Sequence, residues 1–255
     1  MITSTANPLV KDLVRLRSTR HRREQGRFLI EGRREVGRAL TAGIPVEAVI
    51  VCPDLDPISP PDGVRVIEMA EAPFRKVSAR QSPDGTLAVA PLLPTGLDRI
   101  RFSPPALVLW LEGVEKPGNL GAMLRTADGV GADAVVVSDP ATDIHNPNVV
   151  RSSQGALFTV PVAVTSTEAA LNRFAADGIR IVALTPHAPT NLWEADLSGS
   201  VALAIGAEDR GLTGQALAGA ATRCLIPMQG TVDSLNASVA AAVVLYEALR
   251  RRQPS

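Results

Sequence analysis

The sequence predicts an α/β protein with a small N-terminal domain and a larger C-terminal domain built on a mostly parallel β-sheet. In the C-terminal part, apolar runs of strand length alternate with stretches of helical pattern; the runs are ALVLWLEG, AVVVSD, RIVALT, VALAIG and RCLIPM. Runs that are apolar throughout are typical of strands covered on both faces, as in parallel sheets. Ligands of such sheets bind beyond the carboxyl ends of the strands, so the loops after these runs are the candidate functional loops.

Shorter elements alternate in the N-terminal part. The pattern predicts a helix at RREVGRAL and strands at FLIEG, VEAVIVC, VRVIEM and TLAVA. The segment PLLPTGLDRIRFSPP at residues 91–105 is rich in Pro and lacks a sustained period, which is typical of a linker. We therefore predict one domain over residues 1–96 and a second over residues 97–255.

The composition excludes several classes of protein. Of 255 residues, 45% are hydrophobic but only 3% are aromatic, so the core must consist of Ala, Val, Leu and Ile. Cys52 and Cys224 form no CxxC motif and indicate neither a disulfide framework nor a metal site. The N-terminus lacks the pattern of a signal peptide, and the longest apolar run, residues 237–246, is too short to cross a bilayer. We expect a cytoplasmic protein with no membrane partner.

Positive charge is concentrated at the N-terminus although the formal net charge of the chain is zero. Residues 1–40 contain ten Lys and Arg residues but only four acidic residues, and the charge is dense in HRREQGR. A solvated helix face is the alternative explanation for such a run, but an excess of one sign suits a surface that contacts phosphates. The predicted RNA-binding residues are Arg20, Arg22, Arg23 and Arg27.

The loop after ALVLWLEG begins the first candidate site. Pro117 and Gly118 end the strand, and Asn119 is predicted to cap the following helix. Four apolar residues at helical spacing should face the core: Leu120, Leu124, Ala127 and Val130. Arg125 falls at the rim of that face, where it could point into a cleft; the alternative is a surface pair with Asp128.

The loops after VALAIG and RCLIPM are the other two candidates. Gly206 permits close approach of a ligand to the backbone and Glu208 adds a carboxylate, although a plain tight turn would also explain the glycine. The spacing is not that of a dinucleotide-binding GxGxxG. Ser234, Asn236 and Ser238 are more polar residues than capping of the next helix requires, so they indicate recognition of a ligand. That helix is predicted to turn five residues to the core: Leu235, Val239, Val243, Tyr246 and Leu249.

These three loops carry a resemblance. EGVEKPGNLGAMLRTA, IGAEDRGL and IPMQGTVDSLNASVA are similar, in this order, to the three motifs of SpoU (TrmH) type RNA ribose 2′-O-methyltransferases. The segments NPLVKDL through GRFLIEG resemble the RNA-binding domain of members that modify ribosomal RNA, a small α/β module like a ribosomal protein. The resemblance implies a C-terminal domain with a trefoil knot and a homodimer. It also implies that S-adenosylmethionine binds in the knot at Leu184, Gly206, Glu208, Ile226, Met228, Ser234 and Leu235.

The activity implied by the resemblance is methyl transfer to a ribose 2′-hydroxyl. Arg125 would accept the hydroxyl proton or, because a guanidinium keeps its proton in proteins, would instead orient the hydroxyl through an RNA phosphate. Asn119, Ser234 and Asn236 would support it. The N-terminal domain favours ribosomal RNA as the substrate. The alternatives are a tRNA methyltransferase, a resistance enzyme of the thiostrepton type, and a non-catalytic RNA-binding protein of the same fold.

Overall fold

The computed structural model describes residues 1–253, which divide into two compact units. The first unit comprises Met1–Leu93 together with Asp143–Thr159, and the second unit comprises the remainder of the chain. The first break lies inside the predicted linker. The sequence did not predict that residues 143–159, which lie between two C-terminal strands, fold with the N-terminal elements.

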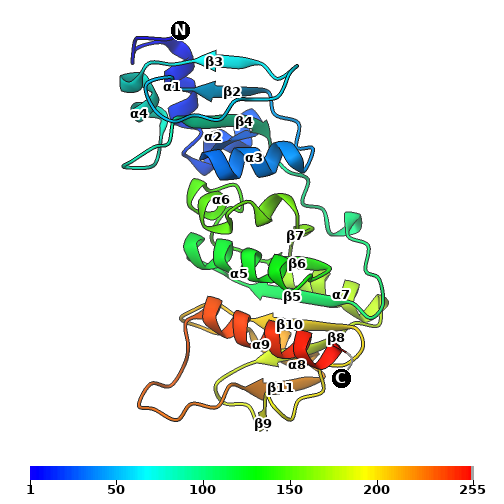
Figure 1. Ribbon diagram of the computed structural model, residues 1–255. Helices are drawn as coiled ribbons and strands as arrows, with labels where there is room; N and C mark the ends of the chain where they lie inside the picture. Colours follow the sequence, from blue (N-terminus) through cyan, green and yellow to red (C-terminus); the bar gives the residue numbers. More distant parts are fainter. Residues whose placement is uncertain (254–255) are drawn as a thin grey trace. The chain divides into compact units, whose positions relative to one another are not determined.

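The first unit contains a four-stranded sheet in the order β1-β4-β2-β3 (Figure 1). The strands are β1 (Arg27–Glu31), β2 (Ala48–Val51), β3 (Val66–Glu68) and β4 (Thr86–Pro91). β4 is antiparallel to both of its neighbours, whereas β2 and β3 are parallel. The helices are α1 (Pro8–Arg15), α2 (Thr19–Gln25), α3 (Arg33–Thr41), α4 (Glu71–Val77) and α6 (Pro147–Ser153). The four predicted strands and the predicted helix of this part are confirmed.

Specific contacts hold residues 143–159 in the first unit. Asp143 forms a 2.7 Å ion pair with Arg22 of α2. The ring of His145 packs at 4.8 Å from that of Phe28, and its Nε2 accepts a 2.9 Å hydrogen bond from the backbone of Leu93. Each of these partners is distant in sequence, so local pattern gave no sign of the arrangement.

The second unit contains a seven-stranded sheet in the order β7-β6-β5-β10-β8-β11-β9, and every neighbouring pair is parallel. The strands are β5 (Leu107–Glu112), β6 (Ala134–Ser138), β7 (Val162–Thr165), β8 (Arg180–Leu184), β9 (Thr190–Asn191), β10 (Val201–Ile205) and β11 (Thr222–Leu225). Its helices are α5 (Pro117–Gly129), α7 (Thr167–Ala176), α8 (Gly214–Gly219) and α9 (Ala237–Arg252). The predicted parallel sheet is confirmed. β7, of four residues, and β9, of two residues, were not predicted. The knot concerns how the chain threads, which strand order does not establish, so it stays a prediction.

Helix α5 begins earlier than the sequence suggested. Lys116 is the residue before the helix, and Pro117 occupies its first turn, where a missing N–H costs nothing. Asn119 therefore lies inside the first turn and does not cap it, so that prediction was wrong. The four residues predicted to face the core are all buried, as expected.

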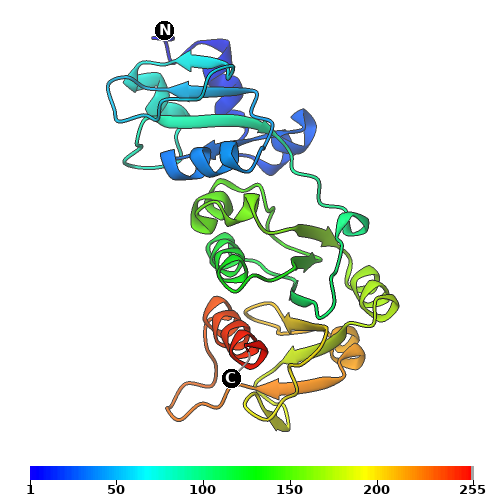
Figure 2. The same ribbon diagram turned by 45° about the vertical axis from the view of Figure 1, so that its right-hand side comes forward.

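Helix α9 presents the opposite face to the one predicted. It packs against α5 and β10 (Figure 2), and its buried apolar residues include Ala241, Val244 and Leu245. Val239 and Tyr246, which were predicted to face the core, are exposed. The helix is apolar on more than one side, so helical spacing alone could not choose the buried face. None of the helices within residues 1–253 has the length and apolar character needed to span a bilayer.

Candidate functional site

The three motif loops leave the sheet of the second unit at its carboxyl edge. β5, β10, β8 and β11 are consecutive in the sheet and parallel, so their carboxyl ends meet at one edge. Leu184, Gly206 and Ile226 lie at or directly after the ends of three adjacent strands. The fold therefore brings together positions that are up to 42 residues apart in sequence.

A chain of side-chain hydrogen bonds joins all three motifs. The amide Nδ2 of Asn119 on α5 donates to Glu208 Oε1 at 2.6 Å. The Asn119 Oδ1 accepts from Asn236 Nδ2 at 3.3 Å. Asn236 caps α9, because its Oδ1 accepts from the backbone N–H of Ser238 at 2.9 Å. Asn119 is thus the central link, and each amide is oriented by the partner on either side.

Glu208 has one oxygen unsatisfied. Its Oε2 is buried and has no hydrogen-bond partner among the described residues. A buried carboxylate oxygen without a donor is costly, and in native proteins such a group often marks a site for a ligand or an ion. This oxygen lies at the edge where the motif loops converge, so it is a candidate ligand contact.

Gly206 is required by the turn that carries Glu208. Ala207 and Gly211 exchange backbone hydrogen bonds of 3.1 and 2.9 Å across this turn. A Cβ on Gly206 would lie 2.0 Å from the carbonyl carbon of Gly211. The glycine is therefore needed to close the turn whether or not a ligand approaches, and a larger residue there would disturb Glu208 as well.

The loop between β11 and α9 has a free backbone. From residue 226 to residue 235, no backbone group makes a hydrogen bond to another part of the described chain. Ile226, Met228 and Leu235 are partly buried, whereas Ser234 is exposed. Peptide groups held at a sheet edge without internal partners are available to bind a polar ligand.

Arg125 lies on α5, six residues after Asn119, and its side chain is exposed. It makes no hydrogen bond or ion pair with any other residue of the described chain, so the alternative surface pair with Asp128 is not formed. Nor does Ser234 hydrogen-bond to the Asn119 chain. The structure thus links Asn119, Glu208 and Asn236 directly, and places Arg125 and Ser234 outside that chain.

Glu112 is a residue of this edge that the sequence analysis missed. It ends β5, it is buried, and its Oε1 accepts from the hydroxyls of Thr167 and Thr213 at 2.7 and 2.8 Å. Its Oε2 accepts from the backbone N–H of Thr213 at 2.7 Å, which fixes the far end of the loop that carries Glu208. A carboxylate at the end of an otherwise apolar strand was the available signal.

The sequence of this chain matches two family models. Residues 106–246 match the SpoU rRNA Methylase family, and residues 7–88 match the MRM3-like substrate binding domain. The first match covers more than half of the chain. This protein belongs to the SpoU family. The three motif loops around Asn119, Glu208 and Asn236 all lie within that match.

Similar SpoU proteins match this chain over nearly its whole length. The Bacillus subtilis protein named 23S rRNA (guanosine(2553)-2′-O)-methyltransferase RlmP is 33% identical, and the match covers 96% of this chain and 97% of the relative. A crystal structure of an RNA 2′-O ribose methyltransferase is 45% identical with a TM-score of 0.87 and covers 98% of both chains. The SpoU methyltransferase AviRb from Streptomyces viridochromogenes, solved in complex with AdoMet, is 28% identical with a TM-score of 0.88, covering 96% of this chain and 98% of its own.

The substrate-binding unit of this SpoU protein uses several of its arginines internally. Arg22 is completely buried, binds Asp143, and donates to the carbonyls of Leu16 and Arg17 at 2.9 and 2.8 Å. Its prediction as an RNA contact was wrong, because no face of the guanidinium is open. The density of charge in the sequence could not distinguish a buried arginine from an exposed one.

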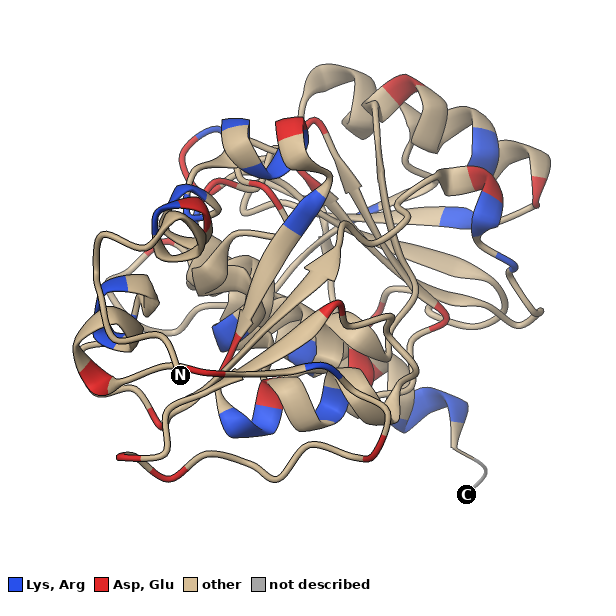
Figure 3. Cartoon of the chain, turned by 90° about the horizontal axis from the view of Figure 1, so that it is seen from above, with Lys and Arg blue, Asp and Glu red and all other residues tan. Residues whose placement is uncertain are grey.

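The other predicted RNA contacts differ in how free they are. Arg27 is mostly buried and pairs with Asp12 at 2.6 Å and with Glu47 at 3.3 Å. Arg20 is exposed and pairs with Glu24, whereas Arg23 is exposed and has no ion pair in the described chain. Blue and red segments are interspersed along the ribbon (Figure 3). Of the ten basic residues in residues 1–40, four form ion pairs in the described chain: Arg20, Arg22, Arg27 and Arg33.

Proposed function

We propose that this protein transfers a methyl group from S-adenosylmethionine to a ribose 2′-hydroxyl of ribosomal RNA. The observation that carries the proposal is the Glu208–Asn119–Asn236 hydrogen-bond chain, which ties the three SpoU motifs into one site. A protein that only binds RNA would not require three motif loops to be joined in this way at the edge of the sheet.

The edge of the sheet fits S-adenosylmethionine. Leu184, Ile226, Met228 and Leu235 would form its apolar wall, and the unpaired peptide groups of residues 226–235 would bind its polar atoms. The buried Oε2 of Glu208 would accept a hydrogen bond from it. Gly206 would contribute through the turn that it permits. The cofactor supplies an activated methyl group on a sulfonium leaving group, so no metal or covalent enzyme intermediate is needed.

The residues of this chain then have two tasks, to orient the ribose and to let its hydroxyl lose a proton. The oxygen–methyl bond forms as the methyl–sulfonium bond breaks, and the proton passes to the adjacent RNA phosphate. Arg125 is the group best suited to the first task, because an unpaired, planar guanidinium can grip the adjacent phosphate with two hydrogen bonds. Asn119 and Asn236, fixed by the chain described above, would hold the ribose hydroxyl by hydrogen bonds. Ser234 is exposed on the same loop and would join them. Alignment of this kind lowers the barrier without a covalent step.

Ribosomal RNA is the substrate that the relatives favour. RlmP, a 23S rRNA enzyme, matches both the catalytic part and the N-terminal part of this chain. A substrate-binding module over residues 7–88 provides the RNA contacts, to which Arg20 and Arg23 contribute. An rRNA substrate also fits the expected cytoplasmic location.

The deciding experiment maps 2′-O-methylated nucleotides on total RNA from cells with and without the gene. We expect one ribosomal position to lose its methyl group in the deletion strain and to regain it on complementation. Loss of a tRNA methyl group instead would support the alternative substrate. An unchanged map, together with no methyl transfer to any RNA in vitro, would leave only the non-catalytic alternative.

We further propose a homodimer formed through the exposed face of α9. One side of α9 packs on α5, whereas the side chains of Val239 and Tyr246 on this helix are exposed to solvent. Large exposed apolar side chains on one helix face are typical of an interface. The chain is then expected to sediment as a dimer, and Tyr246→Glu to sediment as a monomer. Trp193→Ser, which removes an exposed aromatic ring elsewhere in the same unit, should leave the dimer intact.

A further inference from the structure

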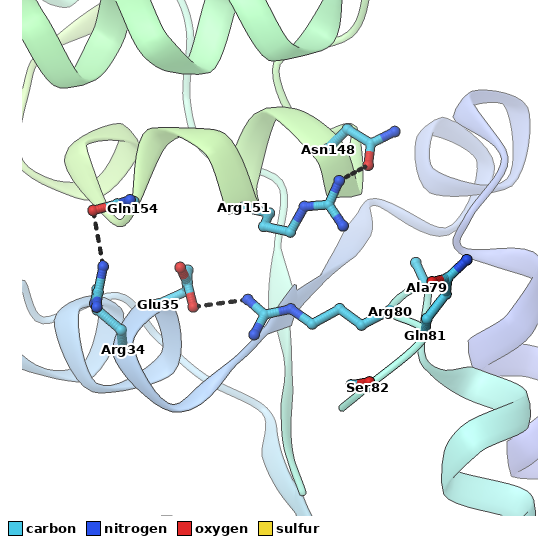
Figure 4. Close-up of a pocket in the computed structure, with 9 residues that line it drawn as sticks. All are labelled: Arg34, Glu35, Ala79, Arg80, Gln81, Ser82, Asn148, Arg151 and Gln154. Atoms are coloured by element: carbon cyan, nitrogen blue, oxygen red, sulfur yellow. Dashed lines mark hydrogen bonds and ion pairs between the residues drawn. The ribbon is translucent and has the colours of Figure 1, made fainter. Parts of the chain in front are cut away.

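We propose that the first unit contains a second RNA site, a pocket that holds one unpaired nucleotide at a distance in sequence from the methyl-transfer motifs. It is a cavity of about 670 Å³ between α3, the segment before β4, and α6 (Figure 4). Its lining consists of Arg34, Glu35, Ala79, Arg80, Gln81, Ser82, Asn148, Arg151 and Gln154. The inference rests on the proposed function, because it takes the ligand to be the RNA substrate.

The charge of the pocket favours an anion. Three arginines line it, against one carboxylate, Glu35. Arg34 donates to the Gln154 amide at 2.8 Å, and Arg151 donates to the Asn148 amide at 2.9 Å. Both partners are neutral, and neither arginine forms an ion pair in the described chain. Their charges are therefore available to a phosphate, unlike those of Arg22 and Arg27.

Arg80 forms the rigid floor of the pocket. Its Nη2 donates to the Glu31 carbonyl at 2.8 Å and to Glu35 at 3.1 Å, and its Nη1 to Asp84 at 3.4 Å. The Nε of the same guanidinium is buried and has no partner among the described residues. Asp84 and Glu35 neutralise part of this charge, so the net attraction comes from Arg34 and Arg151.

The neutral lining indicates a nucleotide rather than a bare anion. Gln81, Ser82, Asn148 and Gln154 offer both donors and acceptors, which is what reading the edge of a base requires. No aromatic ring lines the pocket, so stacking would have to come from a guanidinium plane. We therefore assign phosphate binding to Arg34 and Arg151 and base recognition to the amides.

The pocket combines residues of α6 with residues of the N-terminal elements. Asn148 and Arg151 belong to the range that matches the SpoU methylase model, whereas Arg34 and Arg80 belong to the substrate-binding model. Gly155 permits the junction, because a Cβ at this position would lie 2.4 Å from the Arg38 side chain. The pocket is thus composite, and substrate selection involves residues from both modules.

The test measures binding of deproteinised 23S rRNA by filter retention over a range of salt concentrations. Arg34→Gln and Arg151→Gln, singly and together, remove charge from the pocket. We expect each to weaken binding about ten-fold and to reduce the salt slope by roughly 0.7 to 0.9 per lost phosphate contact. Arg65→Gln removes the same charge from an exposed arginine of the same unit that does not line the pocket, so it should leave both quantities unchanged.

Circular dichroism, calorimetric binding of S-adenosylmethionine and of AMP, and ultraviolet cross-linking decide among the outcomes. Circular dichroism and calorimetric binding of S-adenosylmethionine should be the same in all variants. Ultraviolet cross-linking to the rRNA should label peptides containing residues 79–82 or 148–154, and labelling confined to other peptides would contradict the proposal. If the double variant binds rRNA as tightly as Arg65→Gln, the pocket is not an RNA site. If it loses binding of AMP but not of rRNA, the pocket holds a free nucleotide and the proposal is overturned.

The same data separate this inference from the proposed function. If the wild-type protein neither binds rRNA nor transfers methyl groups to it, the proposed function fails. If the wild-type protein does both and the double variant behaves like the wild type, only the second site fails.

Discussion

Arg22 of the first unit and Arg125 of the second both occur on helices within polar sequence motifs, but they differ in burial and in hydrogen-bond partners. Arg22 is buried, and Asp143, Thr19 and two backbone carbonyls surround its guanidinium. Arg125 is exposed and has no partner in the described chain. The comparison teaches that residue type and motif do not assign a role. A polar group whose hydrogen bonds are all satisfied within the protein stabilises the fold. A polar group that lacks a partner in the protein is available to bind a ligand.

The carboxylates show the same contrast. Burial would raise the pKa of Asp143, but hydrogen bonds from His145 and from Arg22 outweigh it and hold the pKa well below its ordinary value. Both oxygens of Asp143 have partners. Glu208, in the second unit, has a partner for one oxygen only. If the comparison is right, substitution of fully hydrogen-bonded groups should lower the free energy of unfolding. Substitution of groups that lack partners should instead affect ligand binding or catalysis.

The largest effect is expected for Arg22→Ala. Removal of Arg22 leaves Asp143, a largely buried carboxylate, without its cationic partner, which costs about 3–5 kcal/mol. Urea denaturation should show a large loss in the free energy of unfolding, while Arg23→Ala on the same helix should stay within about 0.5 kcal/mol of wild type. A small effect of Arg22→Ala on unfolding, together with a large loss of RNA affinity, would reverse the comparison.

Arg125→Ala should leave folding intact and slow methyl transfer. We expect a loss of roughly 10²-fold or more in the single-turnover rate, as for a group that aligns or deprotonates the nucleophile, with unchanged affinity for S-adenosylmethionine. Arg125→Lys separates the two tasks, because lysine can lose a proton but cannot make a planar, two-pronged contact with phosphate. Rescue by Lys with a rate that rises with pH indicates proton removal. Failure of Lys indicates alignment, and full activity of the Ala variant would remove Arg125 from the site.

Glu208→Gln tests the unsatisfied carboxylate oxygen. The amide can still accept from Asn119 but cannot offer a charged acceptor to the cofactor. The binding free energy of S-adenosylmethionine should therefore become less favourable by roughly 1.5–3 kcal/mol. Calorimetry is the measurement. Glu168→Gln, an exposed carboxylate in the first turn of α7, is the matched control and should bind normally. Unchanged affinity in Glu208→Gln would show that the open oxygen faces no ligand.

The smallest effect concerns Glu247, whose oxygens are fully partnered on α9. Hydrogen bonds from Arg250 and then from Arg251, opposed by burial, lower the pKa of Glu247 to about 2 from 4.5. A lowered pKa stabilises the fold above pH 4.5 and the contribution is lost as the pH falls toward 2. Between pH 5 and pH 3, Glu247→Gln should therefore lose less of its free energy of unfolding than the wild type. Equal losses in the two proteins would mean that this ion-pair cluster contributes nothing measurable.

The sequence by itself determined nine of the eleven strands of the described chain, the parallel sheet and the identity of the motif loops. Continuous apolar runs dictate burial on both faces, and residues such as Leu120 and Leu124 follow the helical period, so these features depend only on neighbours along the chain. The resemblance of the motifs then marked Asn119, Glu208 and Asn236, although it gave no account of how they touch.

Only the tertiary structure decided which polar groups have hydrogen-bond or ion-pair partners within the protein and which do not. Arg22 and Arg34 belong to the same basic stretch, but one meets Asp143, more than a hundred residues away, and the other meets only the neutral Gln154. The face of α9 that packs on α5 likewise depends on a partner helix that sequence period does not contain. The partners of these residues are distant in sequence, so no local sequence pattern identifies them. The free energy of burying a polar group depends on which residues the fold places beside it.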